Sequence, residues 1–164
     1  MEPIAERDPL RIFRTFAVHE ELAPRTGVIG AGILAHGLLS GPEREVVIQR
    51  TCFLCGAEYE WGVHATLFAE QDGLNETQLH STVNGSADDD CWTPREAIAF
   101  RLADELHAEA SVSDEFFGAL GKHFSDEEIL ELVVIAGWYR TIPYVINTAQ
   151  VELEEWAARF PAAS

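Results

Sequence analysis

The stretch Glu43–His64, EREVVIQRTCFLCGAEYEWGVH, gathers more reactive side chains than any other part of the 164-residue sequence. It contains two of the three cysteines, as the pair Cys52-Phe-Leu-Cys55. Just before it, Ser40-Gly-Pro-Glu43 has the form of a helix capping box with proline in the first turn. We therefore expect a helix that begins near Ser40, is kinked or divided at Gly56, and continues over residues 57–70.

Other segments also have the signatures of helices. Thr93-Pro-Arg-Glu96 and Ser125-Asp-Glu-Glu128 repeat the capping-box pattern, and Asp8-Pro9 places an N-cap residue before a proline. No segment alternates persuasively as a strand. Helices are expected at residues 9–22, 28–37, 40–70, 93–106, 113–120, 125–145 and 151–160, with a short one capped by Asn75. The sequence thus predicts an all-α fold of about seven helices, with the second one buried.

Length, composition and charge narrow the class of protein. We expect a single domain over residues 1–164, with an irregular terminus at 1–7 and a polar loop at 84–90. The formal net charge of −17 argues against binding nucleic acid or an anionic membrane surface. The start lacks the pattern of a signal peptide, and the apolar run at 28–39 is too short to span a bilayer. We therefore expect a cytoplasmic protein.

Helical spacing predicts which side chains meet around the cysteine pair. On a straight helix that advances about 100° per residue, Cys52, Tyr59 and Cys55 lie ~20°, ~40° and ~80° from Glu45. These four side chains would share one face. A carboxylate beside two thiols one turn apart is suited to thiol chemistry, because the thiolate is the reactive form and a base must take its proton.

Three other polar side chains fit this face less well. On the same straight helix, Glu58 and His64 point away from the cysteines. Glu60 and His64 are four residues apart, so a Glu–His pair on a separate face is expected, which would raise the basicity of the imidazole. A bend at Gly56 would bring His64 towards the cysteines.

Structural interpretations compete with the catalytic one. Cysteines often serve only as small, buried apolar side chains, which is a second interpretation of Cys52 and Cys55. Tyr59 and Trp61 are typical core aromatics. Glu43 is a favourable charge in the first turn of a helix. A structural zinc site needs about four ligands, and no second cysteine or histidine pair accompanies the first, so no metal site is expected. Cys91 lies beside an acidic loop and is assigned no role.

The stretch resembles the carboxymuconolactone decarboxylase and alkylhydroperoxidase D-like superfamily. The resemblance rests on Glu43-Arg-Glu45, Cys52-Phe-Leu-Cys55 and the string CGAEYEWGVH that ends at His64, with weaker likeness in ADELH at Ala103–His107 and over 125–151. It implies an all-helical homo-oligomer, commonly a trimer or hexamer. Members are thiol-dependent peroxidases or decarboxylases of a lactone carboxylate, and neither type requires a metal or an organic cofactor.

The resemblance also implies roles for residues. The later cysteine of the pair, Cys55, would attack a hydroperoxide and Cys52 would resolve it to a disulfide. An upstream glutamate, Glu45 or Glu43, and a downstream histidine would move the proton. The peroxidase pattern places that histidine four residues after the second cysteine, where this chain has Tyr59, and His64 follows five residues later.

The leading hypothesis is therefore a cofactor-free, thiol-dependent hydroperoxidase with an antioxidant role, which an external dithiol of unknown identity reduces. The first alternative is a decarboxylase, lyase or hydrolase of a small lactone carboxylate, with His64 and either Glu60 or Glu58 as acid and base. The only basic residues near the motif that would bind such an anion are Arg44 and Arg50. The second alternative is a non-catalytic oligomer that binds a small apolar ligand.

Overall fold

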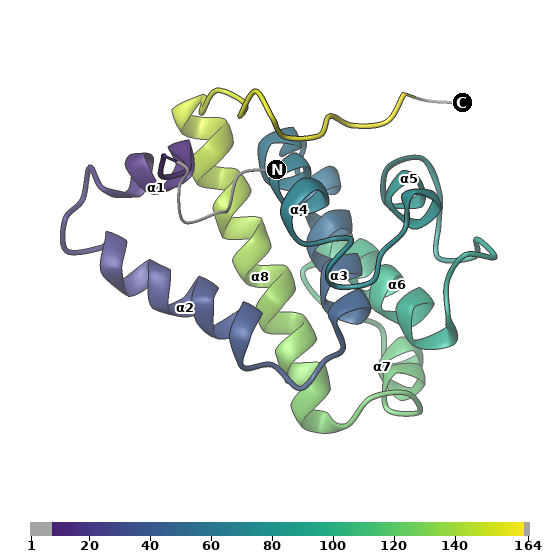
Figure 1. Cartoon of the computed structure of the whole chain (residues 1–164). Helices are drawn as coiled ribbons and strands as arrows, with labels where there is room; N and C mark the ends of the chain where they lie inside the picture. The colour runs from purple at the N-terminus through teal and green to yellow at the C-terminus, as the bar shows by residue number, and fades with distance from the viewer. Residues whose placement is uncertain (1–7, 163–164) are drawn as a thin grey trace.

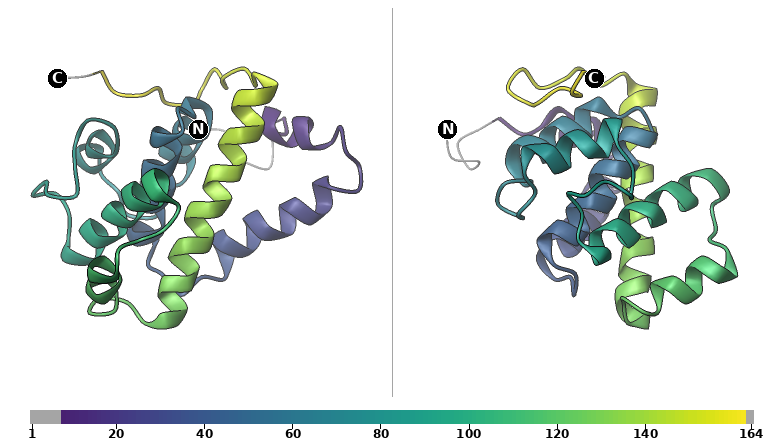
Figure 2. Two further views of the ribbon diagram at one scale, coloured as in Figure 1. Left: turned by 180° about the vertical axis from the view of Figure 1, so that it is seen from behind. Right: turned by 90° about the vertical axis from the view of Figure 1, so that its right-hand side faces the viewer.

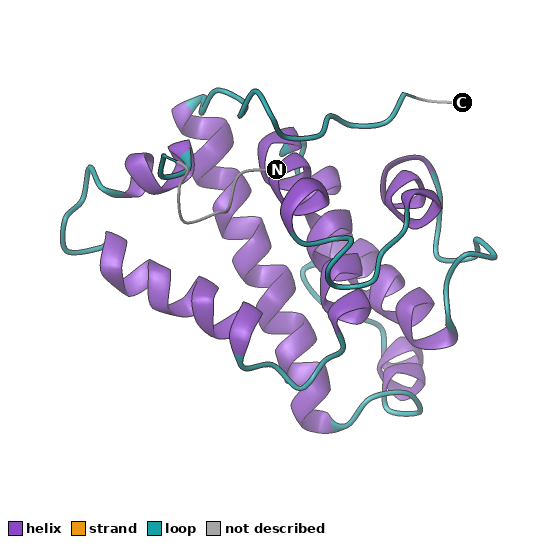
Figure 3. Cartoon of the chain, in the orientation of Figure 1, coloured by secondary structure: helices purple, strands orange, loops and turns teal. Residues whose placement is uncertain are grey.

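The computed structural model describes residues 8–162, and within them the chain forms eight α-helices and no strand (Figures 1 and 3). The all-α prediction is confirmed, while the irregular terminus expected at 1–7 lies outside the described residues. The helices are α1 (Arg11–Phe16), α2 (Ala23–Ala35), α3 (Gly41–Leu54), α4 (Glu58–Leu67), α5 (Glu76–Asn84), α6 (Pro94–Glu109), α7 (Asp114–Leu120) and α8 (Asp126–Ala149).

Helix α3 lies at the centre of the fold and packs against α4, α5, α6 and α8 (Figures 1 and 2). Its Val46, Val47 and Ile48 are completely buried, and so is the polar Glu45. Apolar burial of this kind contributes about 1.5–3 kcal/mol per side chain. The central helix is therefore held on all sides, and the polar groups it carries are fixed in position.

The starts of α3, α6 and α8 follow the predicted capping boxes, whereas the expected Asp8 cap of the first helix is wrong, because α1 begins at Arg11 after Leu10. Thr93 Oγ1 accepts from the Glu96 backbone N–H at 3.3 Å, and Ser125 Oγ accepts from that of Glu128 at 3.3 Å. At the start of α3, the Ser40 backbone N–H donates to Glu43 Oε2 at 3.0 Å. These bonds satisfy N–H groups that have no partner inside the helix, which fixes where each helix begins.

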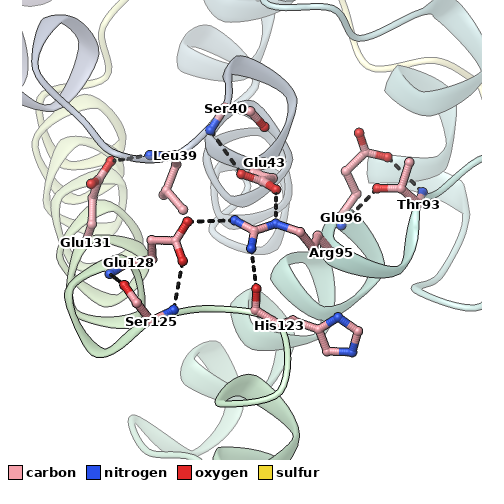
Figure 4. A network of polar contacts seen from close by, with 10 residues as sticks. All are labelled: Leu39, Ser40, Glu43, Thr93, Arg95, Glu96, His123, Ser125, Glu128 and Glu131. Carbon is pink, nitrogen blue, oxygen red and sulfur yellow. Dashed lines mark hydrogen bonds and ion pairs between the residues drawn. The ribbon is translucent and has the colours of Figure 1, made fainter.

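Arg95 of α6 joins the starts of α3 and α8 (Figure 4). Its guanidinium binds the Glu43 carboxylate, Glu128 Oε1 at 2.8 Å and the carbonyl oxygen of His123. Burial on its own would raise the pKa of Glu43, but the hydrogen bonds from Arg95 and Ser40 outweigh it and lower that pKa. Glu43 is thus part of the helix framework.

The first two helices differ from the prediction. Helix α1 ends at Phe16 instead of continuing to residue 22, because the following residues form turns in which His19 Nδ1 accepts from the Leu22 backbone N–H at 3.2 Å. Helix α2 has no buried residue, and its Val28 is 72% exposed. The expectation of a buried second helix is wrong: its glycines leave few side chains to pack, and α2 only covers one side of α8.

The prediction of a helix at residues 151–160 is also wrong. Gln150 adopts a left-handed conformation with φ 51° and ends α8. The chain then runs along α4 without forming a helix, because side chains of α4 satisfy its backbone. Thr66 Oγ1 accepts from the Ala158 N–H at 2.9 Å, and Glu58 Oε1 accepts from the Phe160 N–H at 2.9 Å. Helical periodicity in a segment does not decide its structure when a neighbour supplies hydrogen bonds.

This close packing predicts that Gly62→Ala is destabilising. A Cβ atom at Gly62 would overlap the carbonyl oxygen of Ala158, so the terminal segment would have to move away. We expect a loss of about 1–3 kcal/mol in the free energy of unfolding, measured by urea titration. Gly32→Ala is the control, because a Cβ there meets nothing within 4 Å. Equal stability of the two variants would contradict the prediction.

Helix α8 is, among the described helices, the one long and apolar enough to cross a membrane by length and composition alone. Its inner face is core, however: Leu132 and Ile135 are completely buried, and the helix packs along α3. Its outer face exposes Leu130, Val134 and Tyr144. Half-buried apolar helices of this kind are common in globular cores, and α8 packs as a core helix of this fold.

Candidate active site

The predicted division of the central stretch is confirmed. Helix α3 ends at Leu54, Cys55 caps it, and Gly56 turns the chain with φ +63° before α4 begins at Glu58. A left-handed conformation of this kind favours glycine, since a side chain would be strained there. Cys52 lies in the last turn of α3, so the two thiols sit at the end of one helix, beside the start of the next.

The turn at Gly56 brings His64 of α4 against Glu45 of α3. The imidazole Nδ1 lies 3.2 and 3.1 Å from the two carboxylate oxygens of Glu45, and both side chains are buried. Its Nε2 lies 3.7 Å from Glu60 Oε1. Burial on its own would lower the pKa of His64, but the two carboxylates outweigh it and raise that pKa. Glu45, His64 and Glu60 therefore form one buried cluster, not the two separate groups that a straight helix predicts.

Glu60 is the least satisfied member of this cluster. Its Oε2 is buried and makes no hydrogen bond within the described residues. Burial raises the pKa of Glu60, His64 lowers it, and Glu45 raises it further, with a net upward shift. A buried carboxylate without hydrogen bonds is costly, so this group is set up to take up a proton or a ligand. Among the described residues, no group of three or more His, Cys, Asp or Glu side chains is arranged to hold a metal ion.

Cys52 lies completely buried next to this cluster. Burial raises the pKa of its thiol well above the ordinary value, and the charges of Glu60, Cys55 and Glu45 raise it further. Cys52 is therefore a protonated thiol at neutral pH and has no direct access to solvent. It is poorly suited to attack a substrate first, and better suited to react with a neighbouring oxidised sulfur.

Cys55 is half-buried and has a different neighbour. Its Sγ lies 3.9 Å from Nδ1 of His107, which comes from the last turn of α6. Burial raises the pKa of the Cys55 thiol, while the nearby Arg140 opposes that shift. The Asn147 side chain donates to the Cys55 carbonyl at 2.9 Å and so ties the turn to α8.

His107 is unprotonated at neutral pH, so it can accept a proton, although its lowered pKa makes it a weaker base than a free imidazole. Burial lowers its pKa, and the charge of Arg140 lowers it further, so its ring is neutral at pH 7. Arg140 itself donates to the carbonyl oxygens of Leu106 and His107, at 3.2 Å each, and thereby fixes the end of α6 beside Cys55. An unprotonated imidazole next to a thiol is the arrangement that activates a cysteine nucleophile.

The structure does not bring all of the predicted site residues together. Glu58 accepts from the Phe160 backbone, and Trp61 Nε1 donates to Thr82 Oγ1 at 3.0 Å. Tyr59, which the straight-helix prediction placed beside Cys52, instead faces α1 and the terminal segment. Its hydroxyl donates to Glu154 Oε1 at 2.8 Å and accepts from the Ile12 N–H at 3.2 Å. The prediction that Tyr59 lies beside Cys52 is wrong, because the turn at Gly56 rotates α4 relative to α3.

Two solved structures share this arrangement of helices. One is a protein of unknown function from Agrobacterium tumefaciens, proposed to be the antioxidant defence protein AhpD, with a TM-score of 0.75 and 19% identity over 84% of this chain and 94% of that one. The other is an uncharacterised peroxidase-related protein from Silicibacter sp. TM1040, with a TM-score of 0.78 and 16% identity over 92% of this chain and 80% of that one. The chain has the AhpD-like fold. No protein-family model matches the sequence, and no curated protein matches it significantly.

The AhpD-like fold is the one implied by the resemblance of Glu43–His64, so the fold expectation is confirmed. Sequence reasoning missed His107 as a site residue. The signal was present, because His107 ends the ADELH segment that carried part of the resemblance. The contact itself cannot be read from the sequence, because Cys55 and His107 are 52 residues apart. The packing of α3 against α6 brings them together.

If His107 accepts the proton of Cys55, His107→Ala should slow alkylation of Cys55 at pH 7 by at least about tenfold. The measurement is the rate of iodoacetamide labelling at Cys55, followed by peptide mass spectrometry. His36→Ala is the matched control, because His36 is exposed and lies outside the site. Unchanged labelling of Cys55 in the His107 variant would show that the imidazole does not activate the thiol.

Proposed function

We propose that this AhpD-like chain is a thiol-dependent, peroxidase-like oxidoreductase with an antioxidant role. The observation that carries the proposal is the contact of Cys55 with the neutral imidazole of His107 at 3.9 Å. Cys55 is the more accessible thiol of the pair, and Cys52 lies one helical turn behind it. The chain shares its fold with one protein described as a proposed antioxidant defence protein and with another described as peroxidase-related, and this supports the choice of chemistry.

In the first step, His107 takes the proton of Cys55 and the thiolate attacks the terminal oxygen of a hydroperoxide, ROOH. A sulfur–oxygen bond forms and the oxygen–oxygen bond breaks. Cys55 becomes a sulfenic acid, and the leaving alkoxide receives the proton from His107 and departs as ROH. Arg140 lies close enough to oppose the rise in the pKa of Cys55, so its charge also favours the departing anion.

In the second step, the Cys52 thiol attacks the sulfenic sulfur of Cys55. A sulfur–sulfur bond forms, and water leaves with the hydroxyl of the sulfenic acid and the proton of Cys52. An external dithiol then reduces the disulfide and is itself oxidised to a disulfide, which restores both cysteines. Positions three apart at the end of a helix are about one turn from each other, a spacing that a disulfide accommodates after a modest adjustment.

The contacts of two arginines weigh against the alternative of a small anionic substrate. Arg44 and Arg50 are the basic residues within the central stretch itself, and both are already paired. Arg44 binds Asp72 at 2.7 Å, and Arg50 binds Asp104 at 2.7 Å. A lactone carboxylate that bound to either of them would have to break its ion pair, which disfavours a decarboxylase site built on these two arginines.

We further propose that the protein assembles as a homo-oligomer, as its resemblance implies. Apolar side chains on the outer face of α8 support this, since Leu130, Val134 and Tyr144 are 65%, 47% and 59% exposed. A second copy of the chain would cover them. Sedimentation equilibrium tests the proposal, and a monomer at micromolar concentration would contradict it.

The proposed chemistry is tested by counting free thiols before and after one equivalent of cumene hydroperoxide. The unreacted protein has three free cysteines. We expect two thiols to disappear and to return when dithiothreitol is added, while one, Cys91, remains throughout. The corresponding alcohol is the control and should leave all three thiols free. A thiol count unchanged by the hydroperoxide would refute the proposed function.

A further inference from the structure

A cavity of about 540 Å³ lies between α1, α2, α4 and α8. Most of its wall is apolar, and the cysteines are not among the residues that line it. Its size falls in the range of roughly 300–1,000 Å³ that is typical of small-molecule sites. The principal apolar side chains of the wall are Ile12, Phe16, Leu34, Phe68, Trp138 and Ile142.

One corner of this cavity is polar. Glu60 and His64 both line it, with Glu60 Oε1 and His64 Nε2 separated by 3.7 Å, which is longer than a hydrogen bond. Glu60 is buried, and its Oε2 has no hydrogen-bond partner in the described residues. The terminal torsion of a glutamate is soft, so either oxygen can turn towards the cavity.

His64 is oriented by a contact outside the cavity. Glu45 holds its Nδ1 at 3.1 Å, which leaves Nε2 as the ring nitrogen on the cavity side, facing Glu60. Two neighbouring polar atoms that do not bond to each other can be bridged by one group that both donates and accepts. A hydroxyl does this: it donates its proton to one atom and accepts from, or donates to, the other as their protonation requires.

We propose that this cavity binds a small, uncharged and mostly apolar molecule whose single hydroxyl group bridges Glu60 and His64. The apolar body would occupy the space beneath α2, and the hydroxyl would supply the hydrogen bonds that Glu60 lacks. This site does not rest on the proposed thiol chemistry, because neither Cys52 nor Cys55 lines the cavity.

The charges around the cavity disfavour an anionic relative of such a ligand, and the hydrogen-bonding pattern at His64 disfavours a cationic one. No lysine or arginine lines the described part of the wall, whereas the buried Glu60 does, and Glu45 lies directly behind His64. A carboxylate in this position would meet like charges in a setting of low dielectric constant. An ammonium would pair with Glu60 but could not accept a hydrogen bond from His64 Nε2.

The test uses 2-phenyl-2-propanol as the hydroxyl probe, titrated by calorimetry into the intact protein. Isopropylbenzene serves as the probe without a hydroxyl, and 2-phenylpropanoate as the anionic one. We expect saturable one-site binding of the alcohol and none of the anion in the same concentration range. Absence of alcohol binding, or equally tight binding of the anion, would overturn the proposal.

Two glycine variants test whether the alcohol binds in this cavity. Gly30 lines the cavity, and a Cβ there would lie 3.5 Å from Trp138, so the side chain in Gly30→Leu would fill part of the space. We expect it to abolish binding. Gly32→Leu is the matched control on the same helix, because a Cβ at Gly32 meets nothing within 4 Å and the residue does not line the cavity. Equal binding by both variants would place the probe elsewhere and refute the site.

Glu60→Leu tests the hydroxyl contact. The ratio of alcohol to isopropylbenzene affinity should fall by about tenfold relative to the unmodified protein, since the substitution removes a hydrogen bond that only the alcohol makes. An unchanged ratio would contradict the proposal. If Glu60→Leu fails to fold, the proposal can still be tested. The comparison of probes on the unmodified protein needs no change at Glu60, and neither does the Gly30→Leu experiment. Cys55→Ser should bind the alcohol normally, which separates this site from the thiol reaction.

Discussion

Replacing Cys55 with serine is expected to abolish the loss of thiols caused by hydroperoxide, because the attacking sulfur is gone and Cys52 is buried with a strongly raised pKa. In Cys52→Ser, the first oxidation should proceed and only the disulfide should be lost, leaving a sulfenic acid at Cys55. The measurement is the number and identity of free thiols after one equivalent of cumene hydroperoxide. The two cysteines are therefore expected to give different phenotypes, although both are needed for a complete cycle.

Cys91→Ser is the control for this comparison, since its thiol belongs to the loop before α6 and should not affect the reaction. The pH dependence provides an additional check. Burial raises the pKa of Cys55, so the thiolate fraction, and with it the oxidation rate, should rise as pH increases from 6 to 8. Oxidation that proceeds equally in Cys55→Ser would assign the attack to another sulfur.

The second large effect is expected from Glu45→Leu, which should lower the free energy of unfolding by about 3–5 kcal/mol. Glu45 is completely buried and is the hydrogen-bond partner of His64 Nδ1, so its removal leaves a buried imidazole without that partner. Urea unfolding at pH 6 measures the effect. Glu70→Leu, on an exposed glutamate, is the control and should change stability by less than about 0.5 kcal/mol. A loss at Glu45 no larger than at Glu70 would contradict the role of the cluster.

The sign of the pH dependence follows from the direction of the His64 shift. The folded-state pKa of His64 is raised above its unfolded value of about 6.5, so the folded protein binds this proton more tightly. The resulting stabilisation is complete below pH ~6.5 and is lost as pH rises through the folded-state pKa. In Glu45→Gln the main cause of the raised pKa is removed. The stability difference between the unmodified protein and this variant should therefore be largest near pH 6 and shrink towards pH 9.

The starts of α3, α6 and α8 could be predicted from local chemistry. Thr93 and Ser125 cap helices through bonds to residues three positions later, and such short-range signals are readable in the sequence. The break at Gly56 was likewise foreseeable, since glycine favours the left-handed conformation found there. That a bend there would bring His64 round was foreseeable too, but the angle between α3 and α4 was not, because it depends on how both helices pack against α8. That angle decides that His64, and not Tyr59, faces Glu45 of α3.

The other features that the sequence did not predict depend on contacts between distant segments. His107 reaches Cys55 through the packing of α6 on α3, which a helical wheel of one segment does not describe. The segment after Gln150 has helical periodicity, yet hydrogen bonds from Thr66 and Glu58 hold it in an irregular conformation. In both cases tertiary partners override a local pattern.

The most direct test of the central claim, attack by Cys55, is to trap the sulfenic acid. The Cys52→Ser variant is treated with one equivalent of cumene hydroperoxide in the presence of dimedone, and the labelled peptide is identified by mass spectrometry. We predict a dimedone adduct on Cys55, formed more slowly when His107→Ala is added to the variant. An adduct on Cys91 alone, or no adduct on any cysteine, would contradict the assignment of Cys55 as the attacking thiol.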